Sequence, residues 1–185
     1  MKYCFIVILS LFSISLFGQD KYNYVHYNRL IELKGTDFVI ATIENLGKMQ
    51  TTNGKYLLFI DTKTGGSKQI DFPKDAYIQT IEQVKLDSLG INAVIVIANT
   101  VNLDGSKSIG WNDPRQIILF SPDGQEKIQL TEDKYFLSTW VINRNSGTIV
   151  ATGYYDSNNN GKYDKTDKNE ILVYDLKTKK LITRI

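Results

Sequence analysis

A threefold internal repeat constrains this 185-residue chain more than any other feature of its sequence. Each copy contains a short apolar run with strand character, and each run follows a glycine. The runs are 38–42, 94–98 and 148–152, and the preceding glycines are Gly35, Gly90 and Gly147. These glycines are 55 and 57 residues apart, a period typical of repeated supersecondary units. Because glycine is favoured in tight turns, we interpret all three as hairpin turns.

A second type of strand recurs downstream of the first in every copy. Residues 57–65 resemble residues 171–179, and the middle copy covers 117–124; each ends in a polar turn. Further strands are expected at 29–33, 77–86 and 135–142, and at 68–72, 127–130 and 181–185. Each copy therefore predicts four antiparallel strands. The predicted units cover about 27–73, 77–131 and 135–185 of a single all-β domain at 20–185.

The third copy ends its second strand type with Tyr174-Asp175-Leu176-Lys177-Thr178-Lys179. This segment resembles the Tyr-Asp-Leu-x-Thr-Gly strand end of bacterial β-propellers of the TolB-like type. The resemblance implies a propeller-like all-β fold in which each unit is one blade. Propellers typically have four to eight blades, whereas three units are visible here. The alternatives are therefore an open arc, a ring completed by a second copy or a protein partner, and a β-sandwich or barrel.

The long loop of the third unit has the spacing of a calcium-binding loop. Six positions of the segment 156–167 match: Asp156, Asn158, Asn160, Lys162, Asp164 and Asp167. Calcium takes six to eight oxygen ligands, which such loops supply from positions 1, 3, 5, 7, 9 and 12 around a glycine at position 6. Lys162 would contribute its backbone carbonyl, and Gly161 occupies position 6.

This loop resembles those of EF-hand proteins, with an aspartate at position 12 as in the dockerin-like variant. EF-hands flank the loop with helices, whereas strands are expected on both sides here, at 148–155 and 170–176. We therefore expect one structural calcium ion rather than a calcium sensor. Lys162, Lys165 and Lys168 would weaken the affinity to that of extracellular modules, on the order of 10⁻⁴ to 10⁻³ M. The alternative is a turn-rich loop that binds nothing, since Asn, Asp and Gly favour turns.

The second unit has a comparable loop at 100–113. Asn102, Asp104 and Gly105 are interpreted as positions 3, 5 and 6, and Asp113 is expected to correspond to Asp167. Because Thr100 and Trp111 stand where aspartates are wanted, we do not expect this loop to bind a metal. Its carboxylates and Trp111 suggest an alternative function, a carbohydrate-active or other hydrolase.

The N-terminus has the layout of a secretory signal peptide, predicted to cover residues 1–19. Lys2 precedes an apolar run of 15 residues, which is short for a bilayer crossing of about 20 residues. We therefore expect a periplasmic or extracellular protein without stable membrane insertion. Cleavage would remove Cys4 and leave no cysteine for disulfides or zinc–thiolate sites. The remaining net charge, close to neutral, argues against a nucleic-acid partner.

No catalytic signature is found in the sequence. His26 is the single histidine, and the Gly-x-Ser-x-Gly, phosphate-loop and dinucleotide patterns are absent. No catalytic residue is therefore assigned. The predicted function is that of an exported, non-enzymatic binding or structural module stabilised by one calcium ion.

Overall fold

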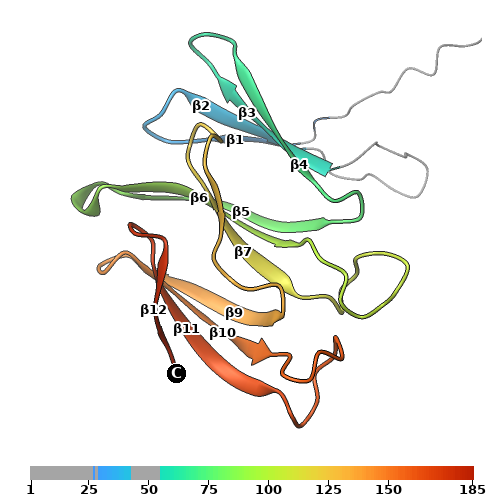
Figure 1. The fold of residues 1–185 in the computed structure, drawn as a ribbon. Coiled ribbons are helices and arrows are strands. Elements are labelled where there is room, and N and C mark those ends of the chain that lie inside the picture. The colour runs from blue at the N-terminus through green and yellow to red at the C-terminus, as the bar shows by residue number, and fades with distance from the viewer. Residues whose placement is uncertain (1–26, 28, 43–54) are drawn as a thin grey trace, which may run out of the picture.

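A computed structural model describes Tyr27, residues 29–42 and residues 55–185 of the chain. These residues form twelve strands and one short 3-10 helix, arranged as three four-stranded antiparallel sheets (Figure 1). The predicted signal peptide, Cys4 and His26 lie outside the described residues. No helix of the described part is long and apolar enough to cross a membrane.

Each sheet is built from four strands that follow one another in sequence. The first sheet contains β1 (Arg29–Glu32), β2 (Phe38–Thr42), β3 (Lys55–Asp61) and β4 (Ser67–Phe72). The middle sheet contains β5 (Tyr77–Leu86), β6 (Ile91–Asn99), β7 (Arg115–Phe120) and β8 (Lys127–Gln129), with the 3-10 helix η1 (Asp87–Leu89) between β5 and β6. The last sheet contains β9 (Tyr135–Asn143), β10 (Thr148–Tyr155), β11 (Lys168–Asp175) and β12 (Lys180–Arg184). The predicted fold class is thereby confirmed, and the arrangement is consistent with both a propeller-like arc and a sandwich.

The middle sheet is covered on both faces. Along β6, Val94, Val96 and Ala98 pack into the core shared with the first sheet. The alternate residues Ile95 and Ile97 pack into the core shared with the last sheet. Because successive side chains of a strand point to opposite faces, a strand between two cores is apolar at every position. This explains the uninterrupted apolar run of β6.

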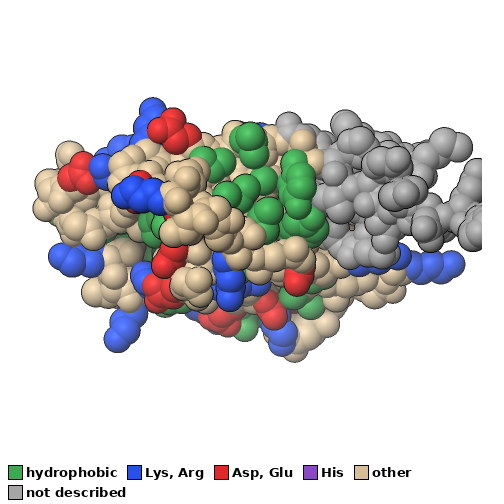
Figure 2. Space-filling view, turned by 90° about the horizontal axis from the view of Figure 1, so that it is seen from above, with side chains coloured by type: hydrophobic (Ala, Val, Ile, Leu, Met, Phe, Trp, Pro, Cys, Tyr) green, Lys and Arg blue, Asp and Glu red, His purple; other side chains and the backbone are tan. Residues whose placement is uncertain are grey.

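The last sheet buries one face and leaves much of the other face exposed. In β10, Ile149 and Ala151 are buried in the core, whereas Val150 is only partly buried. Val150 is paired with Val141 of β9 and Val173 of β11, and Val141 is 60% exposed. The outer face of the last sheet therefore carries apolar β-branched side chains. Figure 2 views the molecule from the side of the first sheet and shows a patch of hydrophobic side chains there too.

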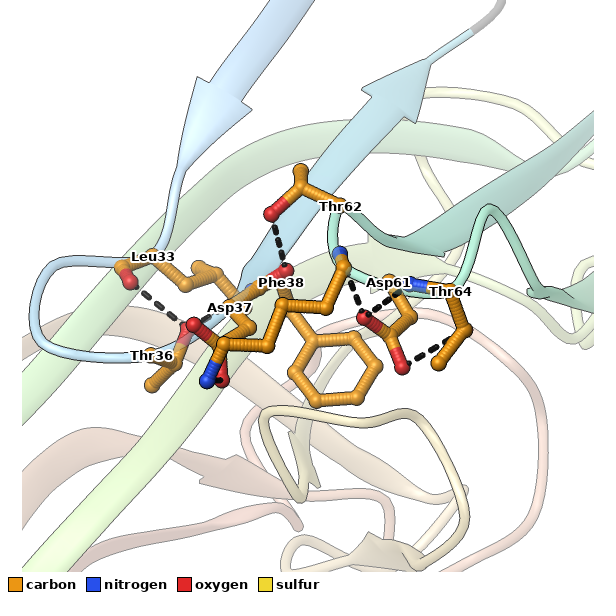
Figure 3. A network of polar contacts seen from close by, with 8 residues as sticks. Leu33, Thr36, Asp37, Phe38, Asp61, Thr62 and Thr64 are labelled. Carbon is orange, nitrogen blue, oxygen red and sulfur yellow. Dashed lines mark hydrogen bonds and ion pairs between the residues drawn. The ribbon is translucent and has the colours of Figure 1, made fainter.

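The hairpin turns of the three units are closed by glycines in the left-handed region, as predicted. Gly35, Gly90 and Gly147 have φ angles of 69°, 65° and 66°. A second set of contacts closes the β3–β4 turn and ties it to the first hairpin (Figure 3). Thr62 donates a 2.8 Å hydrogen bond to the Asp37 carbonyl, and the Asp61 carboxylate accepts hydrogen bonds from its own turn. These bonds, chiefly the one from the Thr64 hydroxyl, lower the pKa of Asp61.

Candidate functional site

Two long loops lie beside each other at one end of the middle and last sheets. They are the β6–β7 loop, 100–114, and the β10–β11 loop, 156–167 (Figure 1). Their backbones touch at Gly161, where a Cβ atom would lie 2.2 Å from the Leu103 carbonyl oxygen. Only glycine permits so close an approach of two backbones. The predicted calcium loop is therefore packed directly against its counterpart in the middle sheet.

The two loops are closed by the same device, an aspartate at the last position. Asp113 and Asp167 each accept an N–H from the residue three positions earlier and another from the residue ten positions earlier. The donors are Gly110 (2.8 Å) and Leu103 (2.7 Å) for Asp113, and Asp164 (2.8 Å) and Ser157 (3.1 Å) for Asp167. The expected correspondence of these two aspartates agrees with this shared pattern.

The remainder of the second loop does not have the register expected from the sequence. Gly105 and Asn159 both adopt left-handed backbone angles, with φ of 73° and 59°. The residue before each one accepts an N–H at its side-chain oxygen, from Ser106 to Asp104 and from Asn160 to Asn158. Residues 102–113 therefore match residues 156–167, and the placement of Asn102, Asp104 and Gly105 at positions 3, 5 and 6 was wrong. They lie at positions 1, 3 and 4.

The side chains of three predicted calcium ligands converge within the last loop. Asp164 Oδ2 accepts hydrogen bonds from the side-chain amides of Asn158 at 2.7 Å and Asn160 at 2.6 Å. Hydrogen bonds from Thr166, and those amides, lower the pKa of Asp164 to about 2. This carboxylate is therefore ionised throughout the physiological pH range.

The two remaining carboxylates of the loop are buried and partly bonded. Asp156 accepts the N–H groups of Asn160 and Gly161, at 3.1 and 2.9 Å, and Asp167 accepts two N–H groups as described above. An ionised carboxylate has about four lone-pair sites, so each retains acceptor capacity for a cation. The carboxylate oxygens of Asp156 and Asp167 and the Lys162 carbonyl oxygen are hard ligands, which fit calcium chemistry. The three carboxylates nevertheless do not form a compact metal-binding group in this structure, since no group of three or more His, Cys, Asp or Glu side chains that could hold a metal is present among the described residues.

A cleft of about 610 Å³ opens between the two loops, a volume typical of small-molecule sites. The middle sheet and its loop contribute Gln79, Trp111, Asn112, Asp113, Pro114 and Arg115, and the last sheet and its loop contribute Phe136, Leu137, Ser138, Tyr154, Gly161, Lys162 and Tyr163. Aromatic rings are prominent. The rings of Phe136 and Tyr154 are stacked with their centroids 4.7 Å apart, and the centroids of Tyr154 and Tyr163 are 4.6 Å apart. The predicted calcium loop thus supplies part of one wall.

A β-bulge from each sheet also faces this cleft. Gln79 is skipped in the pairing of β5 with β6, and Ser138 is skipped in the pairing of β9 with β10. The Arg115 guanidinium bridges both bulges. It donates to the carbonyls of Leu137 and Ser138, the latter at 2.7 Å, and to Gln79 Oε1 at 3.3 Å. Bulges re-aim side chains and are frequent beside functional sites. The cleft is therefore built from equivalent elements of two neighbouring sheets.

The structure separates the residues that sequence reasoning had grouped around Trp111. Trp111 and Asp113 line the cleft, whereas Asp104 does not. Asp113 is only 3% exposed, and both of its oxygens accept backbone hydrogen bonds, so it holds the loop together. Sequence reasoning missed Arg115 and Tyr163. Tyr163 lies inside the predicted calcium loop, and its aromatic side chain there was a usable signal.

No family model matches the chain, and no curated protein matches it. Among solved structures, it is similar to the Pyrococcus horikoshii acylaminoacyl peptidase in an orthorhombic crystal form. The TM-score is 0.44 and the sequence identity 11%, over 88% of this chain. The chain spans 25% of the length of that protein.

Proposed function

We propose that the chain is an exported, non-enzymatic binding module whose ligand site is the cleft between the two loops. The observation that carries this proposal is the cleft itself, which is lined by exposed aromatic rings and by bulges from two sheets. Pockets of this size with a few polar groups are the usual sites of ligand binding. The predicted export agrees with a role in binding molecules outside the cytoplasm.

One calcium ion in the loop 156–167 is the second part of the proposal. Asp156, Asn158, Asn160, Asp164, Asp167 and the Lys162 carbonyl would hold it. The ion would supply positive charge that offsets the repulsion between three carboxylates. Since strands flank the loop, the ion would order one wall of the cleft rather than open a groove.

Thermal unfolding of the purified protein, with calcium and with a chelator, tests the ion. At a calcium concentration ten times the Kd, binding should stabilise the folded state by about 1.4 kcal/mol. Asp164→Asn should lose most of the calcium-dependent rise in melting temperature, because a neutral amide binds calcium more weakly than a carboxylate. The matched control is Asp104→Asn in the other loop, which should keep the rise. Identical melting temperatures with calcium and chelator would remove calcium from the proposal.

Two further predictions stay open beside this proposal. A hydrolase that uses Asp104 and Asp113 is not favoured by the geometry, since Asp113 is engaged by its own loop. A second copy or a protein partner that completes the arc is favoured by the apolar outer face around Val141. Sedimentation of the purified protein tests self-association, and a monomer at high concentration would exclude the second copy.

A further inference from the structure

We infer that the cleft binds an acidic saccharide, a sugar unit that carries a carboxylate. This inference rests on the proposed function, because it assigns a ligand class to the same cleft. It follows from three properties of the lining: exposed aromatic faces, neutral hydrogen-bonding groups and two cationic side chains.

The aromatic faces lie at the surface of the cleft. Trp111 is 79% exposed although it is the largest apolar side chain of its loop, and Tyr163 on the facing loop is 59% exposed. The Trp111 ring packs against Tyr77, with ring centroids 4.7 Å apart, and this contact limits the rotation of the Trp111 side chain. A partly fixed and solvent-exposed indole offers a flat apolar surface with little entropy to lose. The C–H face of a pyranose ring is a matching flat surface.

Neutral polar groups surround these rings. Gln79, Asn112 and Ser138 line the cleft. The Gln79 amide already donates to Asn99 and accepts from Arg115, so Asn112 and Ser138 are the groups left for a ligand, and each has both donor and acceptor atoms. Sugar hydroxyls also donate and accept, so amide and hydroxyl side chains are suitable partners. A purely apolar ligand would instead leave these groups without hydrogen bonds, at a cost in free energy.

Two cationic side chains, Lys162 and Arg115, line the cleft. Lys162 forms no ion pair within the described part of the chain, although its charge, after the hydrogen bonds from Ser106, contributes to the lowered pKa of Asp104 on the facing loop. Four of the five N–H groups of Arg115 are used by Leu137, Ser138 and Gln79, which leaves one for a ligand. The single lining carboxylate, Asp113, is occupied by backbone N–H groups. A carboxylate on the sugar would pair with Lys162 and with the remaining N–H group of Arg115.

The direct test compares sugars that differ only in their charge. The probes are β-1,4-linked trisaccharides of glucuronic acid and of glucose, together with the galacturonic acid trisaccharide and its neutral galactose counterpart. Binding to the purified protein is measured by calorimetry or by NMR titration. The expected result is binding of at least one acidic trisaccharide, several-fold tighter than its neutral counterpart, with an advantage that shrinks as salt is added.

Substitutions locate the binding in the cleft. Trp111→Ala should weaken binding of both acidic and neutral sugars by about tenfold or more, as removal of an exposed aromatic anchor does. Lys162→Gln should weaken the acidic sugar by about two- to fivefold and leave the neutral sugar unchanged. Lys107→Gln is the matched control, because Lys107 is exposed on the other loop and does not line the cleft.

The outcomes separate this inference from the proposed function. Equal binding of acidic and neutral sugars, lost in Trp111→Ala, would overturn the acidic class and keep the cleft as the ligand site. Binding of an acidic sugar that Trp111→Ala and Lys162→Gln leave unchanged would overturn both the inference and the cleft as the site. Absence of binding to all four trisaccharides would overturn the inference alone.

Discussion

The loops 102–113 and 156–167 have the same closing hydrogen bonds and a left-handed residue at the same position, position 4. They differ in their potential metal ligands. Position 9 is Gly110 in one loop and Asp164 in the other, and position 6 is Lys107 and Gly161. Asp113 and Asp167 close their loops in the same way, so the closing hydrogen bonds need the aspartate at position 12 but none of the other side chains that would bind calcium. The remaining calcium-type residues are therefore an addition to a loop that folds through other contacts.

The largest difference between the loops should appear at position 6. Gly161→Ala places a Cβ 2.2 Å from the Leu103 carbonyl oxygen and forces a left-handed backbone on alanine. We expect a loss of about 2–4 kcal/mol in the free energy of unfolding, from strain and overpacking together. Denaturant unfolding measures it.

The control for this prediction is Lys107→Ala at the same position of the other loop. Lys107 is exposed and has an ordinary negative φ, so its truncation should change the stability by less than about 0.5 kcal/mol. Equal losses in the two variants would contradict the view that the loops meet at Gly161.

The closing aspartates come next in expected size. Asp113→Asn should cost about 1.5–3 kcal/mol, because an amide nitrogen would face an N–H donor and charge-assisted bonds would be lost. Asp167→Asn should cost a similar amount in the presence of a chelator and more in calcium. A loss at Asp167 alone would show that the shared closing bonds do not matter, and denaturant unfolding of both variants decides.

A smaller gain in stability is expected when a carboxylate ligand is introduced at position 9 of the loop 102–113. A Cβ atom at Gly110 would have no neighbouring atom within 4 Å, and this glycine does not need a positive φ. Gly110→Asp should therefore be tolerated, and it gives this loop acidic or amide side chains at positions 1, 3, 9 and 12. We expect an additional calcium-dependent stabilisation, about 1.4 kcal/mol at ten times the new Kd. An unchanged response to calcium in thermal melts would contradict the equivalence of the two loops as metal sites.

The smallest effect concerns the left-handed residue at position 4. Gly105→Asn and Asn159→Gly exchange two residues that both tolerate this conformation, so each should change the stability by less than about 1 kcal/mol. Gly105→Val is the contrasting variant, since a β-branched residue is strained at positive φ and should cost clearly more. Comparable stabilities of the asparagine and valine variants would contradict the observed turn.

The strands could be predicted from the sequence because their periodicity is a local property. The apolar runs, the glycine turns and the threefold repeat together predict all twelve strands to within a few residues. The loop register could not be predicted in the same way. Gly105 was matched with Gly161 because both are glycine, but the structure uses Gly105 for a left-handed angle and Gly161 also for close backbone contact. Identity of residue type does not distinguish these two uses.

The cleft could not be predicted from the sequence for a different reason. It depends on the packing of two loops that are about 54 residues apart in sequence, and on bulges at Gln79 and Ser138. A bulge is one extra residue in a strand and leaves the alternation on either side almost intact. Arg115 similarly looks like an ordinary strand residue until its partners on the neighbouring sheet are known.

The double burial of the middle sheet has a consequence for how its central strand is aligned. A one-residue slip of a strand normally exposes its apolar side chains, and the cost fixes the pairing. In β6 both faces are apolar, so a slip would only exchange residues between two cores. The alignment of β6 with its neighbours must then depend on the polar residues at its ends. The Gln83 side-chain amide donates a hydrogen bond to Asn92 Oδ1, and buried Asn99 donates a 2.7 Å hydrogen bond to the Asp113 carbonyl. We infer that these two asparagines help to set the alignment of β6, whose residues 93–98 are all apolar.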